Sequence, residues 1–297
     1  MFFTDGKLQY RVRVDKPDPL FARALQQEIG GVEGEIRVMM QYLFQAWGSR
    51  GPKKYRDMLL DIGTEEIAHV EMLSTMVARL LEKAPVEAQE EAARNPMVGA
   101  IMGGVSPDVV LAGMNPQHII VSGLGATPTD SVGYPWTSRY TVASGNLLAD
   151  FRFNLTAESQ GRLQVTRLYE LSTDPGVRDM LSFLIARDTM HQNQWIAAIA
   201  ELEADGLETT PCPSTFPQEL ELQEVSYQFW NCSEGSQSRQ GRWASGPSMD
   251  GRGEFEYLDM PAPLGPEAEL GMVDPRLHGT SKRPLEPVAS GNGSRKS

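Results

Sequence analysis

Residues 61–69 read Asp-Ile-Gly-Thr-Glu-Glu-Ile-Ala-His and end in a glutamate and a histidine three positions apart, Glu66 and His69. On an α-helix two residues with this spacing lie on the same side, so both side chains can reach one metal ion. A Glu-x-x-His pair alone is weak, because such pairs also occur on helix surfaces. Here the pair stands in an apolar stripe that includes Ile62 and Met76, which indicates that it faces a helical core.

The rest of the chain strengthens this interpretation. Glu35 lies in the middle of an earlier apolar stripe, where an unpaired charge would be costly. The second half of the chain repeats the arrangement, because Glu158 lies in another apolar stripe and is followed by Asp188-Thr189-Met190-His191. Glu35 and His69 are 34 positions apart, and Glu158 and His191 are 33 apart. Helix bundles build dinuclear metal sites from two such matching halves.

Four helical stretches carry these residues, each with apolar positions three or four residues apart. Proline and glycine clusters between them predict breaks, and Ser144 is a candidate N-cap. The stretches are predicted over residues 19–47, 52–84, 144–172 and 177–205.

Short loops join the helices within each pair, which makes each pair an antiparallel hairpin. The sequence therefore predicts an all-α four-helix bundle over residues 1–206, with hairpins at 19–84 and 144–205. Between the hairpins, residues 86–142 are rich in glycine, proline and methionine and form the long crossover that such a bundle requires.

The composition changes from residue 207 onward, where prolines, glycines and aromatic residues become frequent. We expect residues 207–297 to form a mostly irregular tail that packs on the bundle or on a neighbouring subunit. The end of the tail, residues 278–297, is polar, lacks aromatic residues and is predicted to be disordered.

Charge and composition exclude several classes of partner. The formal net charge is −12, from 39 acidic and 27 basic residues, so nucleic acids and anionic membranes are not expected partners. No stretch approaches the ~18 apolar residues that span a bilayer, and the N-terminus does not resemble a signal peptide. We therefore expect a cytoplasmic protein. Cys212 and Cys232 could pair with each other, but two free thiols are the better interpretation.

The ligand types narrow the choice of metal. Carboxylates and imidazoles without a thiolate favour manganese or iron over copper and structural zinc. Two of the four histidines fall in the paired positions, whereas His118 and His278 lie in irregular segments and receive no function. These ligand types alone do not separate manganese from iron.

Several stretches of the sequence resemble those of a known family. Residues 30–35, 61–69, 144–147, 157–158 and 184–192 are similar to the corresponding stretches of the manganese catalases, and the resemblance extends to about residue 260. It implies a ferritin-like bundle that dismutates hydrogen peroxide to dioxygen and water, with two manganese ions per subunit. It also implies a homohexamer in which the tail wraps around a neighbour.

The resemblance also implies the ligands and their partners. Glu35, Glu66 and His69 would hold one ion, Glu158 and His191 the other, and Glu66 would bridge the two.

Tyr42 and Asp188 would act in catalysis next to these ligands. Some relatives have a glutamate at the position of Asp188 and an arginine before the third-helix glutamate, where this chain has Ala157. This difference leaves the handling of protons open, and Asp188 could instead pair with Arg162 or Arg167.

A second implied site is a calcium site, for which the ligands would be oxygen atoms. Asp57 and Asp61 are four residues apart and face the same way on a helix. Some family members bind calcium with such a pair and with the tail, where this chain has Asn231, Ser233 and Gly235. The alternative is two solvated aspartates.

Two other functions compete with the catalase interpretation. One is a di-iron oxidase or ferroxidase on the same bundle, and the other is a non-catalytic coat or structural metalloprotein. Asp188 and the long aromatic tail argue against a ferritin-type iron site. The sequence has no Gly-x-Ser-x-Gly motif and no phosphate-binding glycine loop, so hydrolysis has no support.

Overall fold

The structure is a computed structural model that describes residues 4–82 and 122–271 of the chain. The chain divides into two compact units, Met1–Gln218 and Glu219–Ser297. Residues 207–218 belong to the first unit, where Glu208 accepts a hydrogen bond of 2.7 Å from Asn146 Nδ2.

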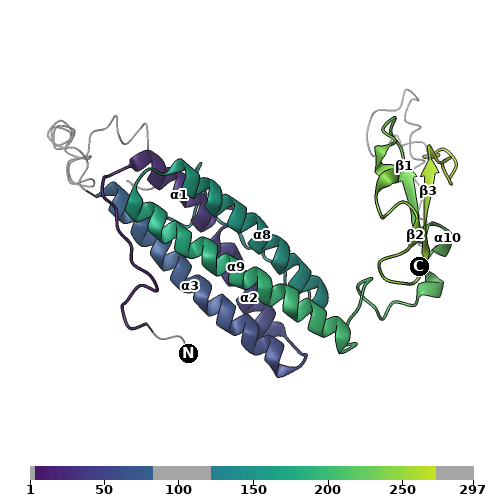
Figure 1. The fold of residues 1–297 in the computed structure, drawn as a ribbon, viewed down its shortest axis with the longest axis horizontal. Helices are drawn as coiled ribbons and strands as arrows, with labels where there is room; N and C mark the ends of the chain where they lie inside the picture. Colours follow the sequence, from purple (N-terminus) through teal and green to yellow (C-terminus); the bar gives the residue numbers. More distant parts are fainter. Residues whose placement is uncertain (1–3, 83–121, 272–297) are drawn as a thin grey trace, which may run out of the picture. The chain divides into compact units, whose positions relative to one another are not determined.

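The first unit contains the helical bundle (Figure 1). α2 packs chiefly against α3, and α8 packs chiefly against α9, which confirms the two predicted hairpins. The helices are α1 (Pro19–Gly30), α2 (Glu35–Gly48), α3 (Lys53–Leu81), α8 (Leu147–Leu171) and α9 (Pro175–Ala204).

The predicted single helix over residues 19–47 is wrong, because the chain breaks between α1 and α2. Gly31 is extended, with φ −69° and ψ 172°, and Gly34 is the N-cap of α2. At Gly30 an added Cβ would lie 2.5 Å from the backbone oxygen of Thr129, so only glycine lets the crossover pass this close. The break makes Glu35 the first residue of α2 and not a mid-helix residue.

The second hairpin begins at a different N-cap from the one predicted. Asn146, not Ser144, caps α8, because its side chain accepts a hydrogen bond from the backbone N–H of Ala149. Ser144 instead donates its hydroxyl to Asp150 at 2.6 Å. The α9 helix starts earlier than predicted, since Asp174 caps it and Pro175 suits its first turn.

The described end of the crossover, residues 122–142, is tied to the first hairpin by glutamine side chains. Gln26 Nε2 donates to the carbonyls of Thr127 and Thr129 at 2.7 and 2.8 Å. Gln45 Nε2 donates to the carbonyl of Val142 at 2.9 Å. The glutamine side chains thus donate hydrogen bonds to backbone carbonyls of an irregular segment, which lacks the internal hydrogen bonds of a helix. The remainder of the predicted crossover, residues 86–121, lies outside the described residues.

The core consists of two apolar clusters that lie one beyond the other along the bundle. One contains Leu25 and Met76, and the other contains Ile62 and Trp195. On α3, α8 and α9 the predicted metal ligands fall between the residues of the first cluster and those of the second, and Glu35 falls between the first-cluster residues of α1 and the second-cluster residues of α2. The polar site is therefore sealed by apolar side chains towards both ends of the bundle.

The second unit contains a three-stranded sheet that the sequence did not predict. Its strand order is β1-β3-β2, with β1 parallel and β2 antiparallel to β3. Phe229 and Tyr257 stack on each other with ring centroids 5.3 Å apart. The strands are β1 (Gln228–Asn231), β2 (Gly246–Pro247) and β3 (Glu254–Asp259).

The described residues test the expectations about the whole chain only in part. Within residues 4–82 and 122–271, no helix combines the length and the apolar character needed to cross a bilayer. Cys212 and Cys232 are both free. Residues 278–297 lie outside the described residues, and the predicted packing of the tail on a neighbour stays a prediction.

The close approach at Gly30 gives the first testable prediction. Gly30→Ala places a methyl group against the Thr129 backbone and should lower the free energy of unfolding by about 1–3 kcal/mol. Gly48→Ala is the matched control, because its Cβ would meet no atom within 4 Å. It should leave stability unchanged or raise it by up to about 1 kcal/mol. Chemical denaturation of both variants measures the difference, and equal stabilities would contradict the role of Gly30.

Candidate metal centre

Four helices each bring carboxylate or imidazole groups to one buried place in the bundle. Glu35 lies on α2, Glu66 and His69 on α3, Glu158 on α8 and His191 on α9. They form two groups of three, Glu35–Glu66–His69 and Glu66–Glu158–His191. In each group the potential ligand atoms lie within 4.8 Å of one another, and all the residues are buried. The structure therefore brings all five predicted ligands together, with Glu66 common to both groups.

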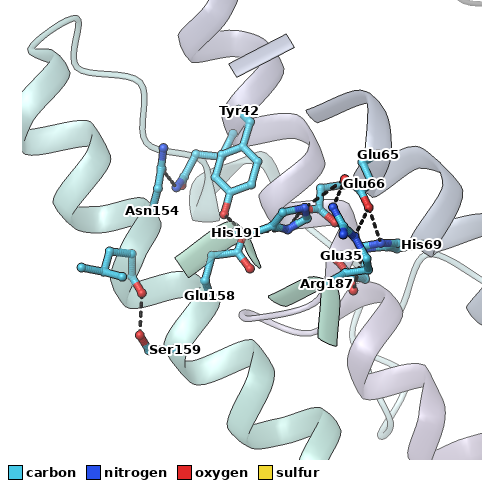
Figure 2. Close-up of polar contacts among 12 residues, drawn as sticks. Glu35, Tyr42, Glu65, Glu66, His69, Asn154, Glu158, Ser159, Arg187 and His191 are labelled. Atoms are coloured by element: carbon cyan, nitrogen blue, oxygen red, sulfur yellow. Dashed lines mark hydrogen bonds and ion pairs between the residues drawn. The ribbon is translucent and has the colours of Figure 1, made fainter. Parts of the chain in front are cut away.

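Glu66 lies between the two histidines, as Figure 2 shows. Its Oε2 is 2.6 Å from His69 Nδ1, and its Oε1 is 3.0 Å from His191 Nδ1. Each of the other two carboxylates completes one group, because Glu35 Oε1 lies 3.6 Å from His69 Nδ1 and Glu158 Oε1 lies 3.6 Å from His191 Nδ1. Both imidazoles thus turn Nδ1 towards the carboxylates.

These groups fit a pair of metal ions. Glu66 is 1% exposed, and its two oxygens and both Nδ1 atoms make no hydrogen bond of acceptable geometry within the described residues. Buried polar atoms without such a bond require another explanation, and a bound ion is one. Carboxylate and imidazole ligands without thiolate suit manganese or iron.

The electrostatics of the metal-free site favour charge separation. Burial alone would raise the pKa of Glu66, but His191 and His69 hold it well below its usual range. Burial would lower the histidine pKa values, but Glu66 raises the pKa of His191 to about 12 and that of His69 well above its usual value. Burial and the charge of Glu66 raise the pKa of Glu35 to about 8. Without metal, both histidines therefore carry protons that an ion would displace.

The predicted catalytic residue Tyr42 lies against one of these carboxylates. Its hydroxyl donates to Glu158 Oε1 at 2.5 Å, and its ring lies 5.0 Å from that of Trp195. Burial and the charge of Glu158 raise the pKa of Tyr42 well above its usual value, so the phenol keeps its proton. Beside it, Gln41 Nε2 donates to Asn154 Oδ1 at 2.7 Å across α2 and α8.

Asp188 is also buried, but the structure gives it no ion-pair partner. The residue is 5% exposed, and no ion pair joins it to another described residue. Arg162 donates instead to Thr189 Oγ1 at 3.0 Å, and no ion pair among the described residues joins Asp188 to Arg162 or to Arg167, so neither alternative pairing is observed. Burial and the charge of Glu35 raise the pKa of Asp188 well above its usual value.

Sequence reasoning missed two acidic residues near the site. Glu65 Oε2 lies 3.2 Å from His191 Nε2, and Arg187 Nε donates to Glu65 Oε1 at 2.6 Å. Glu28 is buried on α1 and accepts a hydrogen bond of 2.6 Å from Gln164. The signal for Glu65 was its position four residues before His69. Its link to α9 is a long-range contact that no local pattern reveals.

The predicted calcium ligands fall in two different units. Asp57 accepts a hydrogen bond of 2.7 Å from Lys53, and Asp61 is exposed on the same helix. In the second unit, Ser233 Oγ donates to Asn231 Oδ1 at 3.3 Å and accepts from the backbone N–H of Gly235 at 3.2 Å. The structure thus groups the three tail residues with one another, and the calcium site stays a prediction.

Comparisons with known proteins agree with this geometry. A family model described as manganese-containing catalase matches residues 1–289. The chain is 55% identical over 280 residues to a manganese catalase of Bacillus subtilis (strain 168), covering 94% of this chain and 98% of that protein. It is 56% identical over 281 residues to the uncharacterized protein YjqC of the same organism, with the same coverage.

A solved structure is also similar. The crystal structure of KatB, a manganese catalase from Anabaena, matches with a TM-score of 0.64 and 26% identity. The match covers 87% of this chain and 99% of KatB.

The protonated histidines predict how metal binding depends on pH. Each ion must displace a proton from an imidazole, so the affinity for Mn²⁺ should fall about tenfold for each unit of pH decrease. The ion beside Glu35 should respond more steeply below about pH 8, because that carboxyl must also ionise. Calorimetric titration of metal-free protein in buffers of different ionisation enthalpy counts the protons released. Uptake without proton release would contradict this assignment.

Proposed function

This chain belongs to the manganese catalase family, and we propose that the two groups of ligands around Glu66 hold the two manganese ions at which it dismutates hydrogen peroxide. One ion would be held by Glu35, Glu66 and His69, and the other by Glu66, Glu158 and His191. The observation that carries the proposal is the position of Glu66, whose two oxygens face the Nδ1 atoms of two different histidines.

The ligand types alone leave iron as an alternative to manganese. The family model and the relatives favour manganese, because they describe or name manganese catalases. Catalase activity would also distinguish this protein from the di-iron oxidase and from the structural metalloprotein considered for the same bundle. When bound, two adjacent redox-active ions would take up two electrons from one peroxide and return them to the next.

The chain's own residues would exclude water and hold protons. Oxidation of one peroxide to dioxygen releases two protons, and reduction of the second to two waters consumes two. Asp188 is the carboxyl proposed to hold a proton, because burial and Glu35 raise its pKa well above the usual value. Tyr42 donates to Glu158 and so fixes the orientation of that carboxylate. The apolar clusters at both ends of the site limit the access of bulk water.

Two further features are proposed from the family resemblance. The protein would assemble as a homohexamer, and α2 supports this because Phe44 and Trp47 are both exposed on it in the single chain. A calcium ion would bind to oxygen ligands from Asp57, Asp61, Asn231, Ser233 and Gly235.

The catalase proposal is tested by oxygen evolution from hydrogen peroxide after production in manganese-supplemented medium. The wild-type protein should release one O₂ for every two peroxides consumed, without an added reductant. Glu66→Gln should abolish this activity, because an amide cannot provide the negative charge shared by both ions. Glu71→Gln is the matched control, since Glu71 is exposed on the same helix. Stable peroxide in the presence of manganese-loaded wild-type protein would contradict the proposal.

Tyr42 can be tested separately from the ligands. Tyr42→Phe removes the hydrogen bond to Glu158 and should lower kcat about 10- to 100-fold while the protein stays folded. Tyr55→Phe is the control, because Tyr55 is a buried tyrosine of the same apolar cluster outside the two groups of ligands. Steady-state oxygen evolution, measured at equal manganese content, gives the comparison. A kcat equal to that of Tyr55→Phe would exclude a role for the Tyr42 hydroxyl.

A further inference from the structure

One carboxylate on α3 lies behind both histidines of the site. Glu65 Oε2 is 3.2 Å from His191 Nε2, a hydrogen-bond distance, and Glu65 Oε1 is 3.7 Å from His69 Nε2, a contact longer than a hydrogen bond. Figure 2 shows Glu65 next to both imidazole rings. Each of its two oxygens therefore faces a different histidine. His69 Nε2 is buried and has no hydrogen-bond partner among the described residues, so Glu65 is its charged neighbour on that side.

Glu65 is itself held from the surface side. Arg187 reaches both of its oxygens, with Nε 2.6 Å from Oε1 and Nη2 3.2 Å from Oε2. Gln9, in the N-terminal segment, donates to Oε1 at 2.8 Å. Such a two-contact guanidinium fixes the orientation of a carboxylate as well as balancing its charge. Glu65 is 18% exposed at its side chain, so it stands between the buried ligands and the solvent.

The chemistry of a histidine ligand requires a group of this kind. A neutral imidazole that gives its Nδ1 lone pair to a metal carries its proton on Nε2. The outward N–H of a ligand histidine is normally paired with a carboxylate, a carbonyl or water, which sets the tautomer and the ring orientation. Both histidines here turn Nδ1 inward to Glu66 and Nε2 outward to Glu65.

We propose that Glu65 is a positioning residue shared by the two ligand histidines, so that one carboxylate couples the two halves of the site. The inference rests on the proposed function, because it assumes that His69 and His191 each bind an ion. It assigns to Arg187 and Gln9 the task of holding Glu65 in place.

The proposal makes an asymmetric prediction for Glu65→Gln. The amide oxygen would take the place of Oε1, which faces two hydrogen-bond donors within 2.8 Å, on Arg187 and Gln9. The amide NH₂ would then take the place of Oε2, which has one longer donor contact, from Arg187 Nη2 at 3.2 Å, and would face His191 Nε2 with a donor. That arrangement favours the tautomer with the proton on Nδ1, which cannot bind a metal. The ion beside His191 should therefore be weakened more than the ion beside His69.

The test measures Mn²⁺ binding to metal-free protein rather than activity. Wild-type protein and the control Glu71→Gln should bind two ions per subunit. Glu65→Gln should bind the second ion about 10- to 100-fold more weakly. At intermediate Mn²⁺ concentration its electron paramagnetic resonance spectrum should show the six-line signal of isolated Mn²⁺. The wild-type protein should show the broad signal of a coupled pair.

The outcomes separate the inference from the proposed function. Two ions bound to Glu65→Gln with wild-type affinity would overturn the positioning role and leave the catalase proposal intact. Failure of the wild-type protein to bind two ions would contradict the proposed function itself. If Glu65→Gln loses its helical circular dichroism signal, Arg187→Lys replaces it, because lysine cannot engage both oxygens of Glu65. Its second ion should also bind more weakly, and wild-type affinity there would overturn the inference.

Discussion

The Glu66 carboxylate is buried between two imidazoles that come from different helical hairpins, and the rest of the site depends on this contact. Leaving an isolated carboxylate in such a place would cost several kcal/mol, so the charge persists only because positive groups surround it. In the metal-free chain those groups are the two protonated histidines. In the metal-bound protein the ions would replace these protons. The same contact therefore both stabilises the bundle and places the ligands for metal.

The positions of the ligands along the helices, and not loops, bring about this contact. Helices α3, α8 and α9 each place their ligands between the two apolar clusters, and Glu35 lies between the cluster residues of α1 and those of α2, so the polar groups share one level of the bundle. The break after α1 matters here, because it makes Glu35 the first residue of α2. A negative charge at a helix N-terminus is favoured by the helix dipole, which offsets part of the cost of burying Glu35. The glutamines of α1 and α2 then hold the crossover against this hairpin.

The sequence predicts which carboxylate and imidazole side chains meet in the bundle, because local spacing encodes their positions. Glu66 and His69 are three residues apart on one helix, Asp188 and His191 repeat this spacing, and Glu35 and Glu158 lie in apolar stripes, so the helical period places them on inward faces. The ferritin-like bundle, which the structure confirms, could be predicted from the same helical spacing. Contacts that join distant segments are not encoded locally, which is why Glu65 and its link to Arg187 were missed. The break at Gly31 was missed because the apolar period continues across it. The strands of the tail are short and give no clear alternation.

The central claim is that two manganese ions lie on either side of Glu66. X-ray diffraction from manganese-loaded crystals, recorded above and below the manganese absorption edge, tests it most directly. The account predicts two anomalous peaks per subunit, one next to His69 and the other next to His191, with the Glu66 carboxylate between them. A single peak, or peaks at a place other than this layer of the bundle, would contradict the account.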